Sequence, residues 1–180
     1  MSKRTELLIE KYYPVDNLLR RTLLRHSRDV ADMAVAIVRR HPELDADELF
    51  VSEAAMLHDI GVFHTNAPGI HCHGTEPYIR HGLLGGELLR AEGLPCHARV
   101  CERHTGAGIT LQNILDQKLP LPHQDFLPET VEEQIVCYAD KFFSKSHPDR
   151  VRSSEQAARS LAKFGEDGVR RFLEWDSRFC

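Results

Sequence analysis

The chain has 180 residues, a length that suits one domain with a substantial core. Its formal net charge of −4 argues against a broad nucleic-acid-binding surface, because such surfaces carry a clear basic excess. The hydrophobic fraction of 42% is ordinary for a soluble protein, and no stretch reaches the length of a membrane span. The first residues also lack the apolar run of a signal peptide, so we expect a soluble, cytoplasmic protein.

The spacing of apolar residues predicts helices from the start of the chain. A short helix is expected over residues 3–12, followed by a long helix that Asp16 caps and that ends near Pro42. Within the long helix, one face is formed by residues spaced three or four apart: Leu19, Leu23, His26, Val30, Met33 and Ile37. His26 is therefore expected to face the core.

The next predicted helix carries the most informative pair of residues. Asp45, with Glu48 three positions later, resembles a capping box and starts a helix that ends in the apolar run 54–57. His58 and Asp59 follow directly. Burying an imidazole beside a carboxylate is costly unless each finds a partner, and a divalent cation satisfies both. The pair therefore predicts a metal site.

Residues 60–76 break the helical pattern with glycine, proline and three histidines: His64, His71 and His73. Long irregular loops inside compact domains are often functional, so the loop over residues 62–79 is where we expect substrate selection. For each histidine alone, a solvated connection is the favoured explanation. A helix is then expected over residues 77–92, ended by Gly93, and a further short helix leads to His104.

The last third of the chain continues the helical pattern. A short helix over residues 109–116 is followed by a helix that Pro128 opens and that ends at Asp140. The tail from 153 to 179 is predicted to form one or two amphipathic helices, broken or bent near Gly165 and Gly168.

The predicted fold class is all-α, a single-domain helical bundle. We expect one domain over residues 1–180, with a metal-site core at about 16–145 and a C-terminal helical extension at 150–180. The five cysteines are odd in number and scattered, with no Cys-x-x-Cys pair, which is typical of reduced thiols inside a cell.

Four residues offer the mixed nitrogen and oxygen ligands that first-row transition metals favour: His26, His58, Asp59 and Asp140. Each has a structural alternative. A histidine on an apolar face can be a hydrogen-bonded core residue, Asp140 a helix-end charge, and the adjacent pair a C-terminal cap. The metal interpretation is favoured because all of these residues lie on or beside apolar faces.

Three segments together resemble the HD-domain superfamily of metal-dependent phosphohydrolases in its His-Asp-Ile-Gly form: His26-Ser27-Arg28-Asp29-Val30-Ala31, Leu57-His58-Asp59-Ile60-Gly61 and Tyr138-Ala139-Asp140-Lys141. The resemblance implies an HD-type bundle in which the four residues above bind one metal. In relatives with two metals, a pair of histidines lies between the doublet and the final aspartate, and His81 and His104 occupy that order. Asp59 would then bridge two ions. With a single ion, the two histidines would contact phosphate instead.

The resemblance implies hydrolysis of a phosphoester or phosphoanhydride by metal-activated water. The expected cofactor is one or two divalent transition-metal ions (iron, manganese, zinc, nickel or cobalt rather than magnesium). Asp59 is the expected catalytic ligand, and Lys141 and Arg103 are candidate phosphate clamps, because phosphoryl transfer needs nearby positive charge. Either cation could also be an ordinary surface residue.

The expected partner is a small phosphorylated molecule, in particular a nucleotide or dinucleotide polyphosphate, with no extended nucleic acid and no membrane; a homodimer is an option. The ligand order and the segment 104–106 resemble HD hydrolases that split diadenosine tetraphosphate symmetrically. Residues 141–146 depart from their aromatic-acidic continuation, and the Gly-Tyr-Pro motif of cyclic-dinucleotide phosphodiesterases is missing. Two alternatives stay open: a di-iron HD-type oxygenase and a non-catalytic nucleotide-binding regulatory module.

Overall fold

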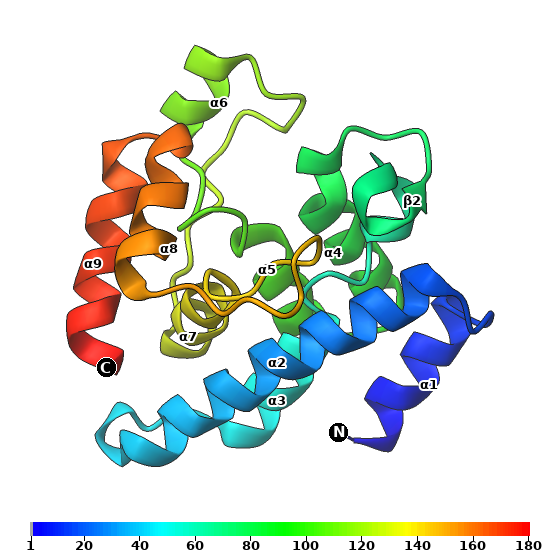
Figure 1. The fold of residues 1–180 in the computed structure, drawn as a ribbon, viewed down its shortest axis with the longest axis horizontal. Helices are drawn as coiled ribbons and strands as arrows, with labels where there is room; N and C mark the ends of the chain where they lie inside the picture. Colours follow the sequence, from blue (N-terminus) through cyan, green and yellow to red (C-terminus); the bar gives the residue numbers. More distant parts are fainter. Residues whose placement is uncertain (1) are drawn as a thin grey trace.

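The computed structural model describes residues 2–180, with Phe164 described by its backbone alone, and it is built from helices and one small hairpin (Figure 1). The α-helices are α1 (Lys3–Tyr12), α2 (Leu18–Arg40), α3 (Glu48–Leu57), α4 (His81–Ala91), α5 (Pro95–Arg103), α6 (Leu111–Gln117), α7 (Val131–Asp140), α8 (Ser154–Leu161) and α9 (Glu166–Phe179). Short 3-10 turns are η1 (Pro42–Leu44), η2 (Val62–His64), η3 (Pro68–Ile70), η4 (Tyr78–Arg80) and η5 (Ala162–Phe164). The predicted all-α fold class is confirmed.

The irregular loop after α3 contains the one hairpin of the described chain. Strands β1 (Asn66–Ala67) and β2 (Cys72–His73) pair antiparallel, with Asn66 opposite His73. Short 3-10 turns and irregular segments form the remainder of the loop, so the connection is irregular, as expected. No helix within residues 2–180 is long and apolar enough to cross a membrane.

Two predicted helix caps are wrong by one or two residues. Asn17, not Asp16, caps α2 by accepting a hydrogen bond from the backbone N–H of Arg20. Asp47 caps α3, while Asp45 ends the preceding turn with a left-handed φ of 51°. A capping residue needs an extended backbone, which Asp45 does not have, so the expected capping box does not form.

The core lies between α2, α3, α5 and α7, whose apolar faces meet. On α2, Val30, Ala34 and Ile37 are all fully buried, as the spacing of the apolar residues predicts. Helix α7 is enclosed on several sides, because α2, α3 and α5 pack against it and α9 covers a further part. Its residues from Ile135 to Asp140 are consequently all buried. Asp140 therefore ends α7 inside the protein.

Helices α8 and α9 pack against each other and α9 packs against α7 (Figure 1). The fully buried Phe172 ring stacks on Tyr138, with ring centroids 5.2 Å apart. The Tyr138 hydroxyl donates to Asp176 at 2.7 Å, which ties α7 to α9. The chain breaks at Gly165, whose φ is 103°, whereas Gly168 lies inside α9, so the second predicted break is wrong.

Helix α7 begins later than predicted, because Thr130, and not Pro128, caps it by accepting from Glu133 N. Helix α4 likewise begins at His81, after the 3-10 turn η4, and ends at Ala91 with the expected glycine following: Gly93 has a φ of 71°. The description of residues 1–180 as one domain with a core and an extension stays a prediction, and Met1 lies outside the described residues.

Candidate metal centre

Six side chains from five helices or helix ends converge inside the protein in two groups that share one residue. The first group is His26, His58, Asp59 and Asp140, and the second is Asp59, His81 and His104. Within each group the candidate ligand atoms all lie within 4.8 Å of one another, and all six residues are buried. The structure therefore brings together all six residues that the sequence predicts as metal ligands.

The first group is held at the junction of α2, α3 and α7. His26 Nε2 lies 2.9 Å from Asp140 Oδ1 and 3.3 Å from Asp59 Oδ2. His58 Nε2 lies 3.1 Å from Asp59 Oδ2 and 3.5 Å from Asp140 Oδ1. Two imidazole nitrogens and two carboxylate oxygens thus surround one small volume.

The second group uses the other oxygen of the shared carboxylate. Asp59 Oδ1 lies 3.4 Å from His81 Nε2 and 3.5 Å from His104 Nε2. The two histidine nitrogens are 3.0 Å apart. Asp59 therefore presents one oxygen to each group, which is the arrangement expected of a bridging carboxylate.

Close backbone packing brings His81 to this position. A Cβ on Gly82 would lie 2.3 Å from the carbonyl oxygen of Cys101, so glycine lets α4 approach the backbone of α5. A Cβ on Gly61 would lie 2.4 Å from the carbonyl oxygen of His81. Gly61 thus allows the end of α3 to pack closely against α4, and Gly82 allows α4 to pack closely against α5.

Three histidines are fixed by the same local hydrogen bond. The Nδ1 atoms of His58, His81 and His104 lie 2.6, 2.7 and 2.7 Å from the carbonyl oxygens of the residues three positions earlier. A carbonyl oxygen only accepts, so each Nδ1 donates and each ring turns its Nε2 toward the cluster. Carbonyls are free to accept at helix ends, where His58 and His104 stand.

These donors fit a divalent cation. Burial lowers the pKa of His81 to about 3 and also lowers that of His104, so both rings are neutral at physiological pH. Two lone pairs then face each other at 3.0 Å beside a carboxylate, an arrangement that repels unless a cation lies between them. The arrangement is compatible with a site for divalent metal.

The charge distribution of the first group is also compatible with a site for a divalent metal. Neither buried oxygen of Asp59 accepts a hydrogen bond of normal geometry, although Lys145 Nζ lies 2.5 Å from Oδ2 as an ion pair. Burial opposes protonation of His58, but Asp59 and Asp140 outweigh it and raise its pKa to about 9. The carboxylates therefore favour positive charge at this point.

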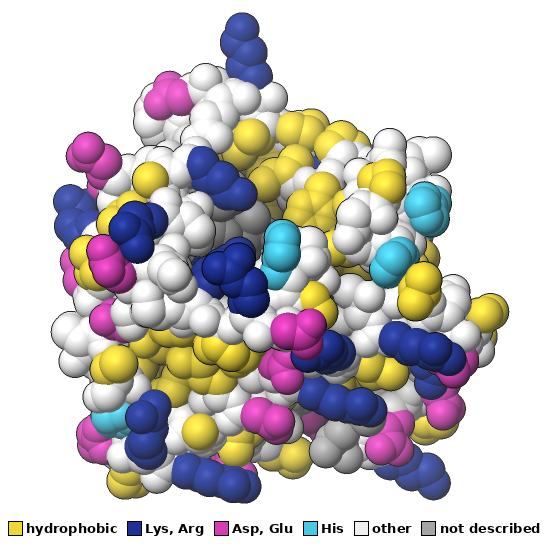
Figure 2. Space-filling model, in the orientation of Figure 1, with side chains coloured by type: hydrophobic (Ala, Val, Ile, Leu, Met, Phe, Trp, Pro, Cys, Tyr) yellow, Lys and Arg dark blue, Asp and Glu magenta, His cyan; other side chains and the backbone are white. Residues whose placement is uncertain are grey.

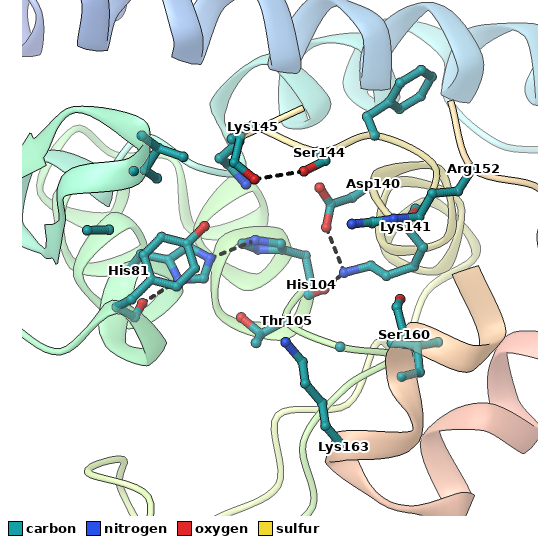
Figure 3. Close-up of a pocket in the computed structure, with 18 residues that line it drawn as sticks. His81, His104, Thr105, Asp140, Lys141, Ser144, Lys145, Arg152, Ser160 and Lys163 are labelled. Atoms are coloured by element: carbon teal, nitrogen blue, oxygen red, sulfur yellow. Dashed lines mark hydrogen bonds and ion pairs between the residues drawn. The ribbon is translucent and has the colours of Figure 1, made fainter. Parts of the chain in front are cut away.

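A cavity of about 410 Å³ opens onto the cluster. His81, His104 and Asp140 line it, whereas the other three candidate ligands lie deeper. Figure 2 shows Lys and Arg side chains bordering a hollow near the middle of this face, with hydrophobic side chains along its upper edge. Figure 3 shows four cationic residues around the cavity: Lys141, Lys145, Arg152 and Lys163. A solute in the cavity therefore meets both the cluster and positive charge.

The two lysines nearest the cluster are bound to its carboxylates. Lys141 Nζ lies 2.6 Å from Asp140 Oδ2 and donates to the carbonyl oxygen of His104 at 3.0 Å. Lys145, a residue not predicted from the sequence, pairs with Asp59, and this carboxylate raises the pKa of Lys145 above its ordinary value even though burial opposes this. No periodic pattern marks Lys145, because it follows the end of α7 in an irregular segment.

Arg103 does not line the cavity. Its guanidinium pairs with Glu129 at 2.9 Å and with Glu133 at 3.1 Å. The expected role of Arg103 as a phosphate clamp therefore has no support in its position. The three loop histidines, His64, His71 and His73, do not line the cavity either. The loop contributes Ala67, Gly69 and Ile70 to the lining instead.

Comparisons with known proteins agree with this geometry. The family model described as HD domain matches residues 23–144, a range that contains all six candidate ligands. The HD domain of the L. monocytogenes phosphodiesterase PgpH has a TM-score of 0.54 and 16% identity, covering 99% of this chain and 88% of that one. This likeness shows a shared fold.

Three relatives are similar in sequence. Two are named tRNA (cytidine(56)-2'-O)-methyltransferase: that of Thermoplasma volcanium is 34% identical over 154 residues and that of Picrophilus torridus 36% over 151. These matches cover 84% and 83% of this chain but 40% and 38% of the relatives, so the chain spans about two fifths of their length. An uncharacterized protein of Methanocaldococcus jannaschii is 37% identical over 129 residues, 69% of this chain and 68% of the relative.

The matched range and the helices that deliver its histidines and aspartates therefore lead to one conclusion, which confirms the resemblance seen in the sequence: this chain belongs to the HD domain family.

Proposed function

We propose that this protein is a metal-dependent phosphohydrolase that cleaves a phosphoester or phosphoanhydride. The observation that carries the proposal is the position of Asp59, which offers one oxygen to each of two groups of buried ligand atoms at the end of a cationic cavity. Divalent ions held in such a site lower the pKa of water and offset the negative charge of phosphoryl oxygens. Transition metals such as iron, manganese, zinc, nickel or cobalt suit the donor set of four histidines and two aspartates.

The chain's own residues have distinct roles in this proposal. His26, His58 and Asp140 would hold metal on one side of Asp59, and His81 and His104 would hold it on the other. Lys141 orients the Asp140 carboxylate through its 2.6 Å ion pair and so acts on the substrate indirectly. Lys145 places an ammonium group at the inner end of the cavity, where it would neutralise a phosphoryl oxygen.

A nucleotide is the substrate class that the cavity favours. Its lining combines the cationic side chains with the aromatic rings of Tyr78 and Phe143. Tyr78 stacks on His81 with ring centroids 4.6 Å apart, so an aromatic face lies beside the candidate ligands. Positive charge suits the phosphate, and an aromatic ring suits the flat face of a base.

The methyltransferase name of two relatives does not extend to this chain through similarity alone. The matched region is about two fifths of each relative, so the similarity does not extend over most of each named protein. The matched region of this chain contains the cluster of histidines and aspartates. We therefore assign the hydrolase proposal to the HD domain itself, in a cytoplasmic protein that acts on small molecules.

The first test measures metal content and hydrolysis on the same preparation. Protein purified without oxygen or chelators should contain about two ions per chain and should release phosphate from members of a nucleotide panel. Asp59→Asn, which keeps the shape of the side chain but removes its charge, should lose both the bound metal and the release of phosphate. His73→Ala is the matched control, because His73 is exposed and does not line the cavity.

Two results would overturn the proposal. Wild-type protein that contains no metal and hydrolyses nothing would favour a binding module, especially if Asp59→Asn bound nucleotides equally well. Iron-loaded protein that consumes oxygen with an organic substrate and releases no phosphate would favour an oxygenase. One ion per chain would be compatible with hydrolysis, but His81 and His104 would then contact the phosphate of the substrate and not the metal.

A further inference from the structure

We propose that the segment after the family-matched region forms a second anion site, so that the preferred substrate carries a further phosphate or other anionic group beyond the one that is cleaved. This inference rests on the proposed phosphohydrolase function and specifies its substrate. The residues that carry it are Arg152 and Lys163, which line the same cavity as His81, His104 and Asp140.

Part of the cavity wall lies outside the matched range of residues 23–144. Arg152, Ser160, Leu161 and Lys163 come from the segment around α8 and η5, which lies beside the cluster because α9 packs on α7. The candidate ligands come from within the matched range. The cavity wall thus combines residues of the matched range with residues of the C-terminal segment, and Figure 3 shows Arg152 on the side of Lys141 and Lys163 on the side of Thr105.

Arg152 is held in place without neutralisation of its charge. Its guanidinium donates to the carbonyl oxygen of Lys141 at 3.0 Å, and its backbone N–H donates to the carbonyl oxygen of Phe142 at 2.9 Å. Across residues 2–180, no carboxylate forms an ion pair with this guanidinium. A guanidinium presents five N–H donors, so the remaining ones are free to bind an anion.

The inner cations differ from Arg152 in this respect. Lys141 and Lys145 are each paired with a carboxylate of the cluster, at 2.6 and 2.5 Å. The guanidinium of Arg152 is therefore a positive charge in the cavity wall that no carboxylate of the described residues neutralises, and Lys163 lines the same cavity. Figure 3 shows Lys163 extending from η5 toward the cavity, on the side where Thr105 lies.

The cavity size favours a small molecule over a macromolecule. A volume of about 410 Å³ falls within the range of pockets that enclose cofactors and metabolites. The chain as a whole is acidic, with a net charge of −4, so the excess positive charge is local to the cavity. A substrate with two anionic groups would place one at the cluster and the other at Arg152 and Lys163.

The test compares binding of two phosphonates that resist hydrolysis. Isothermal titration calorimetry would measure methylphosphonate, with one anionic group, and methylenediphosphonate, with two, on the protein as purified. The double variant Arg152→Gln and Lys163→Gln should bind the diphosphonate about tenfold more weakly or worse, and methylphosphonate within about twofold of wild type. Arg170→Gln, on the exposed face of α9, is the matched control and should change neither affinity.

The result is independent of turnover, so a protein that hydrolyses nothing could still show the second anion site. Lys163→Gln alone provides a variant that folds, because Lys163 is exposed, and it should show part of the same loss. Arg152→Lys should recover some diphosphonate affinity. Equal losses for both phosphonates, or no loss for either, would overturn the inference. Tighter binding of a 5′-phosphorylated oligoribonucleotide than of the diphosphonate, lost in the same variants, would also overturn it and assign the cations to RNA.

Discussion

Replacing Gly61 by alanine tests whether the histidine-aspartate pair depends on close contact with α4. A Cβ at this position would lie 2.4 Å from both Gly85 N and His81 O. Ordinary contact begins at 3.4 Å, so the backbone of α4 has to retreat by about 1 Å. Both opposing atoms belong to the backbone and cannot rotate away.

The cost of this substitution is steric alone. Gly61 has a φ of −85°, a value that alanine adopts readily, so no backbone strain is added. Overpacking of this kind costs typically about 1–3 kcal/mol of unfolding free energy. A retreat of α4 also carries His81 away from His104, whose Nε2 lies 3.0 Å from its own. We therefore expect Gly61→Ala to lose one metal ion per chain as well as stability.

Urea unfolding of the metal-free protein and elemental analysis of the loaded protein would measure the two effects separately. Gly69→Ala is the matched control, because a Cβ there meets nothing within 4 Å. The free energy of unfolding of this control should remain within about 0.5 kcal/mol of the wild-type value, and the control should keep its metal. If Gly61→Ala and Gly69→Ala have the same free energy of unfolding and the same metal content, close packing of Gly61 against α4 does not position His81.

Three further outcomes are expected. His81→Ala should lower bound metal by one ion per chain in elemental analysis; unchanged metal would remove it from the ligand set. Lys145→Met should raise metal affinity about tenfold or more in calorimetry, because its ammonium lies 2.5 Å from the shared carboxylate and competes with a cation; unchanged affinity would contradict this. In the native protein at pH 8, a thiol reagent should label two of the five cysteines, the exposed Cys96 and Cys180. Burial raises the pKa of Cys72 to about 11, so it lacks the thiolate that reacts; rapid labelling of more than two thiols would refute the buried positions.

The parts of the fold that local patterns determine were predictable from the sequence. The three- and four-residue spacing on α2 places His26 on the buried face, and the structure confirms this burial. Helix ends were less predictable, because several residues near an end can cap it. Asn17 and Asp16 are adjacent and both are good caps, and only the backbone geometry selects Asn17.

The charged residues around the site show why neighbours in sequence can differ in role. Successive residues of a helix point about 100° apart, so at the end of α5 His104 faces the cluster while Arg103 pairs with Glu129 and Glu133. Lys145 could not be predicted from any period, because it follows α7 in an irregular segment and its partner, Asp59, is distant in sequence. Its position depends on the tertiary fold.

The fixed histidines have a consequence for the evolution of stability in this protein. The Nδ1 hydrogen bonds of His81 and His104 to the preceding turn prevent these two rings from rotating to relieve the repulsion between their facing lone pairs. Repulsion between these nitrogens therefore destabilises the metal-free fold at its centre, while the same fixed rings keep the metal site preformed. Substitutions that abolish metal binding could raise the melting temperature of the metal-free protein, so selection for stability alone would remove these histidines.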